Sequence, residues 1–311
     1  MTNLSFSGMK ASLKNKGLYF CVMEASKYLF PIRWVKEKSL MDRIYQRRAY
    51  NYLKRKYVPL LQSFVPASAD ETAIPRIVWI CWLQGEENAP ELVKKCISSV
   101  REQMPDYDVR VITWENMGEY ANIPACIYDR LSKRQMQFAQ FSDYLRACLL
   151  CAHGGIWLDS TVLLTAPLPQ RYLSSPLFVL KTSAFDNDII RNSSWLICSQ
   201  KNNPLLQQTK FLLDRYWEKE NRLCDYYLFH LLMAAVAGYS NENRKMWMHI
   251  PFEGNANAHR LQALLFEKYS DAIFDDVCTA SPVHKLTYKF GKRCEDELQD
   301  TFYSRLIGGN L

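Results

Sequence analysis

The sequence predicts an α/β fold, a mixed sheet flanked by helices with a basic helical segment before it. Residues 77–82 form a continuous apolar run that is rich in β-forming residues and ends near Gly85, which is typical of a strand buried on both faces. Helical periodicity follows over residues 91–103, and a second strand pattern covers residues 107–114. A strand, a helix and a strand in this order indicate parallel pairing. With 311 residues, 48% of them apolar, the chain can bury a large core.

The next elements lead to a polar residue at a strand end. A helix is expected over residues 133–153, stopped by Gly154 and Gly155, and residues 156–158 then form a short strand that ends at Asp159. Ligands of open α/β sheets bind at the carboxyl edge of the strands, so Asp159 is the first candidate site residue. The same kinds of pattern predict two further strands and an apolar helix, over residues 177–180, 195–198 and 225–237.

The net charge of +7 is a local property of the N-terminal segment. Residues 1–60 contain thirteen Lys and Arg against three acidic residues, whereas the rest of the chain contains 26 basic and 29 acidic residues. The body of the protein is therefore slightly acidic. This distribution excludes a basic, nucleic-acid-binding surface over the whole protein, and no nucleic-acid partner is expected.

Residues 1–70 are expected to form a basic, aromatic-rich helical segment and residues 71–311 the main domain, with a proline-containing connector at 58–75. Two interpretations of the basic segment remain open. Residues 1–60 could lie on an anionic membrane surface, or they could pack on the domain with a solvated charged face. The sequence shows neither a long enough apolar run to span a bilayer nor a secretory pattern, so a cytoplasmic protein is expected, peripheral on the inner membrane face if the segment binds lipid.

The ten cysteines are scattered, mostly within apolar runs, which suits a reducing compartment. Cys148 and Cys151 form a CxxC pair in the middle of the expected helix, with no second pair nearby. Structural packing is therefore favoured over zinc or redox chemistry.

Two motifs carry a resemblance to a known family: residues 142–146 (SDYLR) and residues 154–161 (GGIWLDST), preceded by a similar first strand over residues 74–82. Together they resemble the bacterial capsular polysaccharide synthesis glycosyltransferases. These are related to the glycosyltransferases with a DXD-containing sugar-binding motif and, more remotely, to glucosylating clostridial toxins. The resemblance implies a GT-A-like, Rossmann-like nucleotide-sugar-binding domain. It also implies retaining transfer from a UDP-sugar to a polysaccharide or lipid-linked glycan in capsule or surface polysaccharide synthesis.

The resemblance assigns Asp159 to the first acid of the motif, which contacts the sugar or ribose of the donor, while the second acid binds a metal. Thr161 stands in the place of that second acid. A leaving diphosphate develops negative charge, so a divalent cation, Mn²⁺ or Mg²⁺, is expected, with Asp159, Thr161 and His284 as candidate ligands. The alternative role for Asp159 is to cap the turn after its strand.

The donor is expected to contact three further residues. Asp143 and Arg146 lie three residues apart and so share a helix face. The resemblance implies that Asp143 accepts hydrogen bonds from sugar hydroxyls and that Arg146 recognises sugar or phosphate, the alternative being a surface salt bridge. Trp82 matches the position at which an aromatic ring stacks on the base of the donor, and core packing is the alternative for this ring.

Four polar residues complete the candidates. Asn116 could contact the nucleotide or cap its own loop. His284 and Lys285 occupy a late segment that resembles the family, where His284 would bind the metal and Lys285 would neutralise the diphosphate, although a lone histidine is often structural. Asp225 is the second candidate catalytic residue, since it matches an Asp-Tyr element that could orient the acceptor; it could also be the N-cap of the following helix.

Two competing functions remain open at this stage. The chain could be a non-catalytic nucleotide- or carbohydrate-binding subunit, for which Thr161 in place of an acid is the indication. It could also be a toxin-like transferase that modifies a protein.

Overall fold

The computed structural model describes residues 38–69, 73–182, 189–291 and 298–309 of the chain. In this part, the main sheet has five strands in the order β2-β1-β3-β6-β5. Their bounds are β1 Ile77–Cys81, β2 Asp108–Ile112, β3 Gly155–Leu158, β5 Leu177–Lys181 and β6 Asn192–Ser199. Strand β1 pairs in parallel with β2 and β3, whereas β6 runs antiparallel to both β3 and β5. The predicted mixed α/β sheet and the parallel pairing of its first two strands are confirmed.

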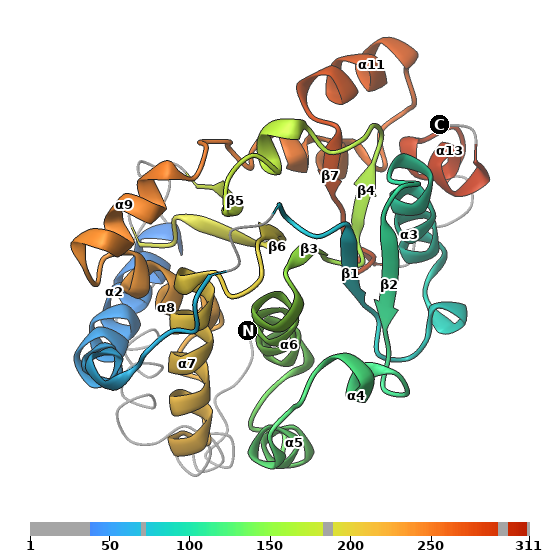
Figure 1. Cartoon of the computed structure of the whole chain (residues 1–311). Helices are drawn as coiled ribbons and strands as arrows, with labels where there is room; N and C mark the ends of the chain where they lie inside the picture. Colours follow the sequence, from blue (N-terminus) through green and yellow to red (C-terminus); the bar gives the residue numbers. More distant parts are fainter. Residues whose placement is uncertain (1–37, 70–72, 183–188, 292–297, 310–311) are drawn as a thin grey trace.

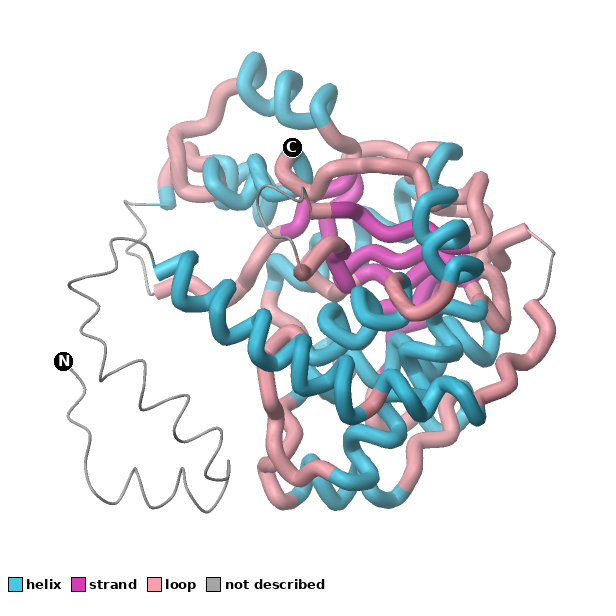
Figure 2. Tube along the Cα trace, turned by 90° about the vertical axis from the view of Figure 1, so that its left-hand side faces the viewer, coloured by secondary structure: helices cyan, strands magenta, loops and turns pink. Residues whose placement is uncertain are grey.

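Helices cover both faces of this sheet (Figures 1 and 2). The strand order places β2 and β3 on opposite sides of β1, so right-handed crossovers put α3 and α6 on opposite faces. Helices α6, α7 and α8 pack against one another, and α2 packs on α8. The bounds of these helices are α2 Lys38–Lys56, α3 Glu91–Gln103, α6 Phe138–His153, α7 Pro204–Lys219 and α8 Leu228–Ala237.

Helix α2 buries one face in the same core as the sheet. Ala49 and Leu53 are fully buried, as is Tyr57 directly after the helix, whereas Arg48 and Lys54 are exposed. In residues 38–56, therefore, the chain forms a helix that packs on α8 and exposes charged side chains on its outer face. The expected connector begins with a 3₁₀ helix, η2 (Val58–Ser63), which also adds buried residues to the core. Residues 1–37 lie outside the described part of the chain.

Helix α6 begins at Phe138, five residues later than the sequence predicted. The cause is a tight turn in which Arg134 has a φ of 55° and the amides of Gln135 and Met136 both donate to the carbonyl of Arg130. These backbone groups are used in the turn and are not available to extend the helix.

The predicted glycine stop after α6 is confirmed. Gly154 and Gly155 have φ values of 70° and 98°, a region in which residues with a Cβ are strained. A Cβ on Gly155 would lie 2.6 Å from the carbonyl oxygen of Ile77. The glycine pair therefore lets β3 turn sharply away from α6 and approach β1 closely.

A second, two-stranded sheet joins distant parts of the sequence. Strand β4 (Val162–Leu164) pairs antiparallel with β7 (Val283–Lys285), so that Val162 faces Lys285. The sequence analysis did not predict either strand. A second apolar core fills the space between this sheet, α3 and the C-terminal helices; its buried members are Leu92, Cys96, Leu163, Leu261, Leu265, Val277, Leu286, Phe302 and Leu306.

The remaining elements are short. Helix α8 starts at Leu228 rather than at 225, because residues 225–227 form the turn that leads into it. The other bounds are η3 Glu86–Asn88, α4 Met117–Tyr120, α5 Ala125–Ser132, η4 Gln170–Tyr172, α9 Asn241–His249, η5 Asn257–His259, α10 Arg260–Leu264, α11 Asp271–Ala280 and α13 Phe302–Gly308. Among the described residues, no helix combines the length and the apolar character that crossing a membrane requires.

The CxxC pair lies within α6 as a packing element. Cys148 and Cys151 are both buried and both have free thiols. Burial raises the pKa of the Cys148 thiol to about 12, so this group is a neutral thiol at physiological pH. The interpretation as core packing is confirmed.

Candidate active site

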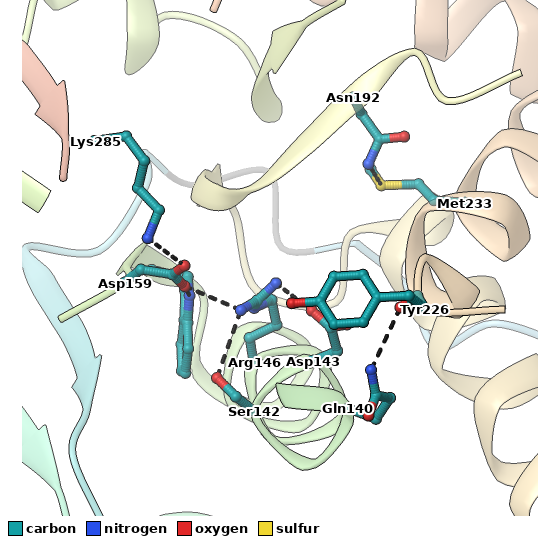
Figure 3. A network of polar contacts seen from close by, with 10 residues as sticks. Gln140, Ser142, Asp143, Arg146, Asp159, Asn192, Tyr226, Met233 and Lys285 are labelled. Carbon is teal, nitrogen blue, oxygen red and sulfur yellow. Dashed lines mark hydrogen bonds and ion pairs between the residues drawn. The ribbon is translucent and has the colours of Figure 1, made fainter. Parts of the chain in front are cut away.

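Four charged side chains meet at the carboxyl edge of the parallel strands (Figure 3). Asp159 directly follows β3, and its amide donates to the carbonyl of Trp195 at 2.9 Å, which fixes its main chain to β6. Asp143 and Arg146 approach from α6, and Lys285 approaches from the end of β7. The sequence analysis selected all four residues, and the structure brings them together.

Arg146 is the centre of this cluster. Its side chain is 4% exposed, its Nη2 donates to Asp159 Oδ1 at 3.0 Å, and its Nη1 donates to Asp143. The guanidinium carbon lies 4.9 Å from the centre of the Trp157 ring. A planar guanidinium suits this combination of forked hydrogen bonding and stacking on an aromatic ring. The alternative of a surface salt bridge between Asp143 and Arg146 is wrong, because the pair is buried.

Asp159 accepts hydrogen bonds on both carboxylate oxygens. Trp157 Nε1 donates to Oδ1 at 3.0 Å, and Lys285 Nζ donates to Oδ2 at 2.9 Å. Burial on its own raises the pKa of the Asp159 carboxyl, but the charges of Lys285 and Arg146 together outweigh it and hold the pKa well below the usual range. Asp159 is therefore ionised at any physiological pH.

Asp143 has the opposite electrostatic character. Burial and, to a smaller extent, the charge of Asp159 raise the pKa of its carboxyl to about 6, against the lowering effect of Arg146. A hydrogen bond with Ser194 favours the ionised form. The two acids of the cluster thus differ in protonation near neutral pH, since Asp159 is charged while Asp143 titrates.

This pKa predicts a pH dependence of stability. Between about pH 4, where an unfolded aspartate ionises, and pH 6, the folded state holds a proton on Asp143 that the unfolded state has lost. The contribution of Asp143 to the free energy of unfolding therefore falls as pH rises through this window, by at most about 1.4 kcal/mol per pH unit. In Asp143→Asn this component of the slope should vanish, as measured by urea unfolding at several pH values.

The matched control for this measurement is Asp129→Asn, which removes a carboxylate from an exposed pair with Lys133. Its pH profile between 4 and 6 should follow that of the parent. Identical slopes in the parent and in Asp143→Asn would contradict the assignment of this titration to Asp143.

Tyr226 borders the cluster, and Trp82, which packs partly against the main core, lies at the same edge of the sheet as Asp159 because β1 and β3 are parallel. Trp82 follows β1, its ring contacts the edge of Tyr288 with 5.4 Å between centroids, and its buried Nε1 has no partner among the described residues. In Figure 3 the Tyr226 ring points toward Arg146 and Asp143, and the negative charge of Asp143 adds to burial in raising the pKa of Tyr226. Tyr226 is 57% exposed, so it forms an accessible rim of the site.

Two predicted site residues are used in turns. The Oδ1 of Asn116 accepts from the amide of Thr113 at 2.9 Å, and its Nδ2 donates to the carbonyl of Val111 at 2.9 Å, which is the loop-capping alternative. Asp225 Oδ1 accepts from the amide of Tyr227 at 2.8 Å, in the turn before α8. This is the capping contact expected of Asp225, although α8 itself begins two residues later than its predicted start, with Tyr227 at the N-cap position.

His284 lies apart from the charged cluster. Lys285 and His284 are neighbours on β7, so their side chains point to opposite sides of the strand. Lys285 contacts Asp159, whereas His284 is fully buried and its Nε2 lies 3.0 Å from Thr165 Oγ1. Burial lowers the pKa of this imidazole to about 4. The expected metal ligands Asp159, Thr161 and His284 are therefore not gathered around one point.

The oxygens of Asp159 and Thr161, which were expected to bind a divalent cation, both contact Lys285. Residues 38–69, 73–182, 189–291 and 298–309 contain no group of three or more His, Cys, Asp or Glu side chains with the geometry to hold a metal. Lys285 Nζ binds Asp159 Oδ2 and also donates to Thr161 Oγ1 at 2.6 Å. The two oxygen ligands expected for the ion thus both bind one ammonium group.

Three residues of the site were not selected from the sequence. Trp157 lies two positions before Asp159. Residues two apart on a strand face the same side, so this spacing could have predicted their contact. Ser194 and His230 come from β6 and α8, and no local pattern connects them to the motifs. His230 is partly buried, and desolvation together with the charge of Arg146 lowers its pKa to about 3.

Comparison with known proteins gives a family and several partial likenesses. A family model described as "Capsular polysaccharide synthesis protein" matches residues 31–306. The "Subversion of eukaryotic traffic protein A" of Legionella pneumophila is 32% identical over 109 residues, which span 33% of this chain and only 16% of that protein.

Two solved structures are also similar. A structure titled "PaToxG Glycosyltransferase" is 16% identical, with 78% of this chain and 95% of that chain covered and a TM-score of 0.37. A mutant of a transferase is 13% identical, with 57% of this chain and 90% of that chain covered and a TM-score of 0.33.

Proposed function

Because the chain belongs to the capsular polysaccharide synthesis protein family, we propose that it is a glycosyltransferase. The proposed reaction moves a sugar from a nucleotide-sugar donor to a polysaccharide or lipid-linked glycan. The bond between the anomeric carbon and the diphosphate oxygen breaks, and the electron pair leaves with the diphosphate. An acceptor hydroxyl oxygen forms the new bond to the same carbon, and its proton passes to the departing diphosphate.

The observation that carries this proposal is the shared cluster of Asp143, Arg146, Asp159 and Lys285 at the carboxyl edge of the parallel strands. Such an edge is where α/β sheets bind nucleotides. Lys285 supplies positive charge for the diphosphate, and Asp143 and Asp159 supply acceptors for sugar hydroxyls. Trp82 provides an aromatic ring on which the base can stack. In other proteins, one stacked base contributes about 1–3 kcal/mol to the binding free energy.

The finer assignment is part of the same proposal. A GT-A-like domain, a UDP-sugar donor and a retaining outcome follow from the resemblance of residues 142–146 and 154–161 to the family motifs. In a retaining reaction of this kind the acceptor attacks the face from which the diphosphate leaves. The reaction then needs no separate base. This agrees with the cluster, because Asp159 is ionised but bound by Arg146 and Lys285 and is therefore not free to accept a proton.

The test is a calorimetric titration of the full chain with UDP-, GDP- and CMP-linked sugars, followed by product analysis with a glycan acceptor. Binding of one donor class and transfer of its labelled sugar to the glycan are expected. Binding without transfer or donor hydrolysis would favour the non-catalytic subunit instead.

A second candidate acceptor is a protein. It is favoured by the 109-residue match to the Legionella protein, whose name refers to the subversion of eukaryotic traffic. Incubation with the labelled donor and a mixture of eukaryotic proteins, compared with glycan acceptors, separates the two candidates by which product carries the label.

We also propose that the basic segment contacts an anionic membrane surface, which can be tested by removing residues 1–37, which contain six Lys and Arg and two Glu. Each basic residue near an anionic surface is worth about 1 kcal/mol, so binding to phosphatidylglycerol vesicles should weaken at least about 100-fold. Residues 38–60 must stay, because Leu53 and Tyr57 are buried in the core. Donor affinity is the control and should not change, whereas undiminished vesicle binding would exclude this role for the segment.

A further inference from the structure

We propose that Lys285 takes the place of a divalent cation in this site, so that the diphosphate of the donor binds without a metal. This inference rests on the proposed function, since it specifies how the same site recognises a nucleoside diphosphate. It departs from the metal that the family resemblance implies.

The ammonium group of Lys285 contacts both of the oxygens expected to bind the metal. A metal in the expected place would bind the oxygens of Asp159 and Thr161. Lys285 Nζ already lies 2.9 Å from Asp159 Oδ2 and 2.6 Å from Thr161 Oγ1. Both are hydrogen-bond distances, so the positive charge of the side chain sits between the two oxygens. A dication at the same point would require the ammonium to leave both partners.

The ammonium of Lys285 retains a free direction. It has three donors, and among the described residues it uses two of them, on Asp159 and Thr161. The Lys285 side chain is 20% exposed, whereas that of Arg146 is 4% exposed. Of the two cations that bind Asp159, Lys285 is therefore the one that can reach a diphosphate oxygen. Arg146 acts as a positioning residue that holds Asp159.

The scaffold around Lys285 is held by main-chain hydrogen bonds. Lys285 pairs with Val162 across the β4–β7 sheet, and the amide of Leu286 donates to the carbonyl of Thr161 at 2.9 Å. Main-chain bonds on both sides thus fix the lysine next to the acid. A charge held in place before the ligand arrives stabilises a developing negative charge without reorganisation.

The experiment titrates UDP, GDP and CDP into the full chain by calorimetry, with Mn²⁺ and, separately, with excess EDTA. For the nucleotide that binds, we expect dissociation constants that agree within about threefold between the two conditions. Lys285→Met should weaken binding at least about tenfold, since a charge-assisted hydrogen bond is lost, and Mn²⁺ should not restore it. Lys285→Arg, which keeps the charge, should bind more tightly than Lys285→Met.

The matched control is Lys201→Met. Lys201 is an exposed lysine just after β6, at the end of the sheet opposite Asp159, and its replacement should leave binding unchanged. Thermal melting of each variant checks that the fold is intact.

The outcomes separate this inference from the function on which it rests. Binding that requires Mn²⁺, or binding that Lys285→Met leaves intact, overturns the inference while the glycosyltransferase proposal stands. If none of the three nucleotides binds in either condition, the proposed function fails, and the inference fails with it.

Discussion

Replacing Arg146 with methionine is expected to lower the free energy of unfolding by about 3–5 kcal/mol at pH 8, because it leaves Asp143 and Asp159, whose side chains are only 13% and 26% exposed, without their shared partner. Arg146 contacts both Asp143 and Asp159, and its side chain is almost completely buried. Lys285 still compensates Asp159, so most of the loss arises from Asp143. Because Asp143 can escape the penalty by binding a proton, the loss should be smaller at pH 5 than at pH 8.

Urea unfolding at the two pH values measures this effect. Arg260→Met is the matched control, because it removes the same kind of side chain from an exposed pair with Asp276 and should cost less than about 1 kcal/mol. Equal losses in the two variants would show that the buried cluster contributes no more than a surface ion pair.

Asp159→Asn is expected to lower the rate of sugar transfer by about 100-fold or more, similar to the loss of a preorganised electrostatic contact in other enzymes. Asparagine has nearly the same shape, so the change removes the negative charge between Arg146 and Lys285. Without this charge the ammonium of Lys285 is no longer held at Thr161, where the diphosphate is proposed to bind.

Release of labelled sugar and transfer to the acceptor measure this rate, and calorimetry with the donor separates a loss of binding from a loss of turnover. Asp276→Asn, which changes an exposed carboxylate, should react at the rate of the parent. An Asp159→Asn variant with the turnover of the parent would remove this carboxylate from the mechanism.

The parts of the fold with strong local periodicity could be predicted from the sequence. The apolar run of β1, the amphipathic pattern of α3 and the glycine pair after α6 each carry their signal within a few residues. The same local logic brought Asp143 and Arg146 onto one helix face and Asp159 to a strand end. These are short-range relations, and the structure confirms them.

The rest depends on contacts between distant residues. Strands β4 and β7 have three residues each, too few for a clear alternating pattern, and only their pairing shows that Lys285 and His284 point to opposite sides. Asn116 is a polar residue after a strand, as a ligand contact would be, and only its two hydrogen bonds identify it as part of a turn. Local sequence does not distinguish these possibilities.

The pairing of β4 with β7 has a consequence for the biosynthesis of the protein. Thr161 and Lys285 are separated by 124 positions along the chain. At a translation rate of about 5–20 residues per second, the ribosome needs roughly 6–25 s to pass from one to the other. Throughout this interval the nascent polypeptide contains Asp143, Arg146 and Asp159 but not Lys285, so the four-residue cluster can form only after residue 285 has been added.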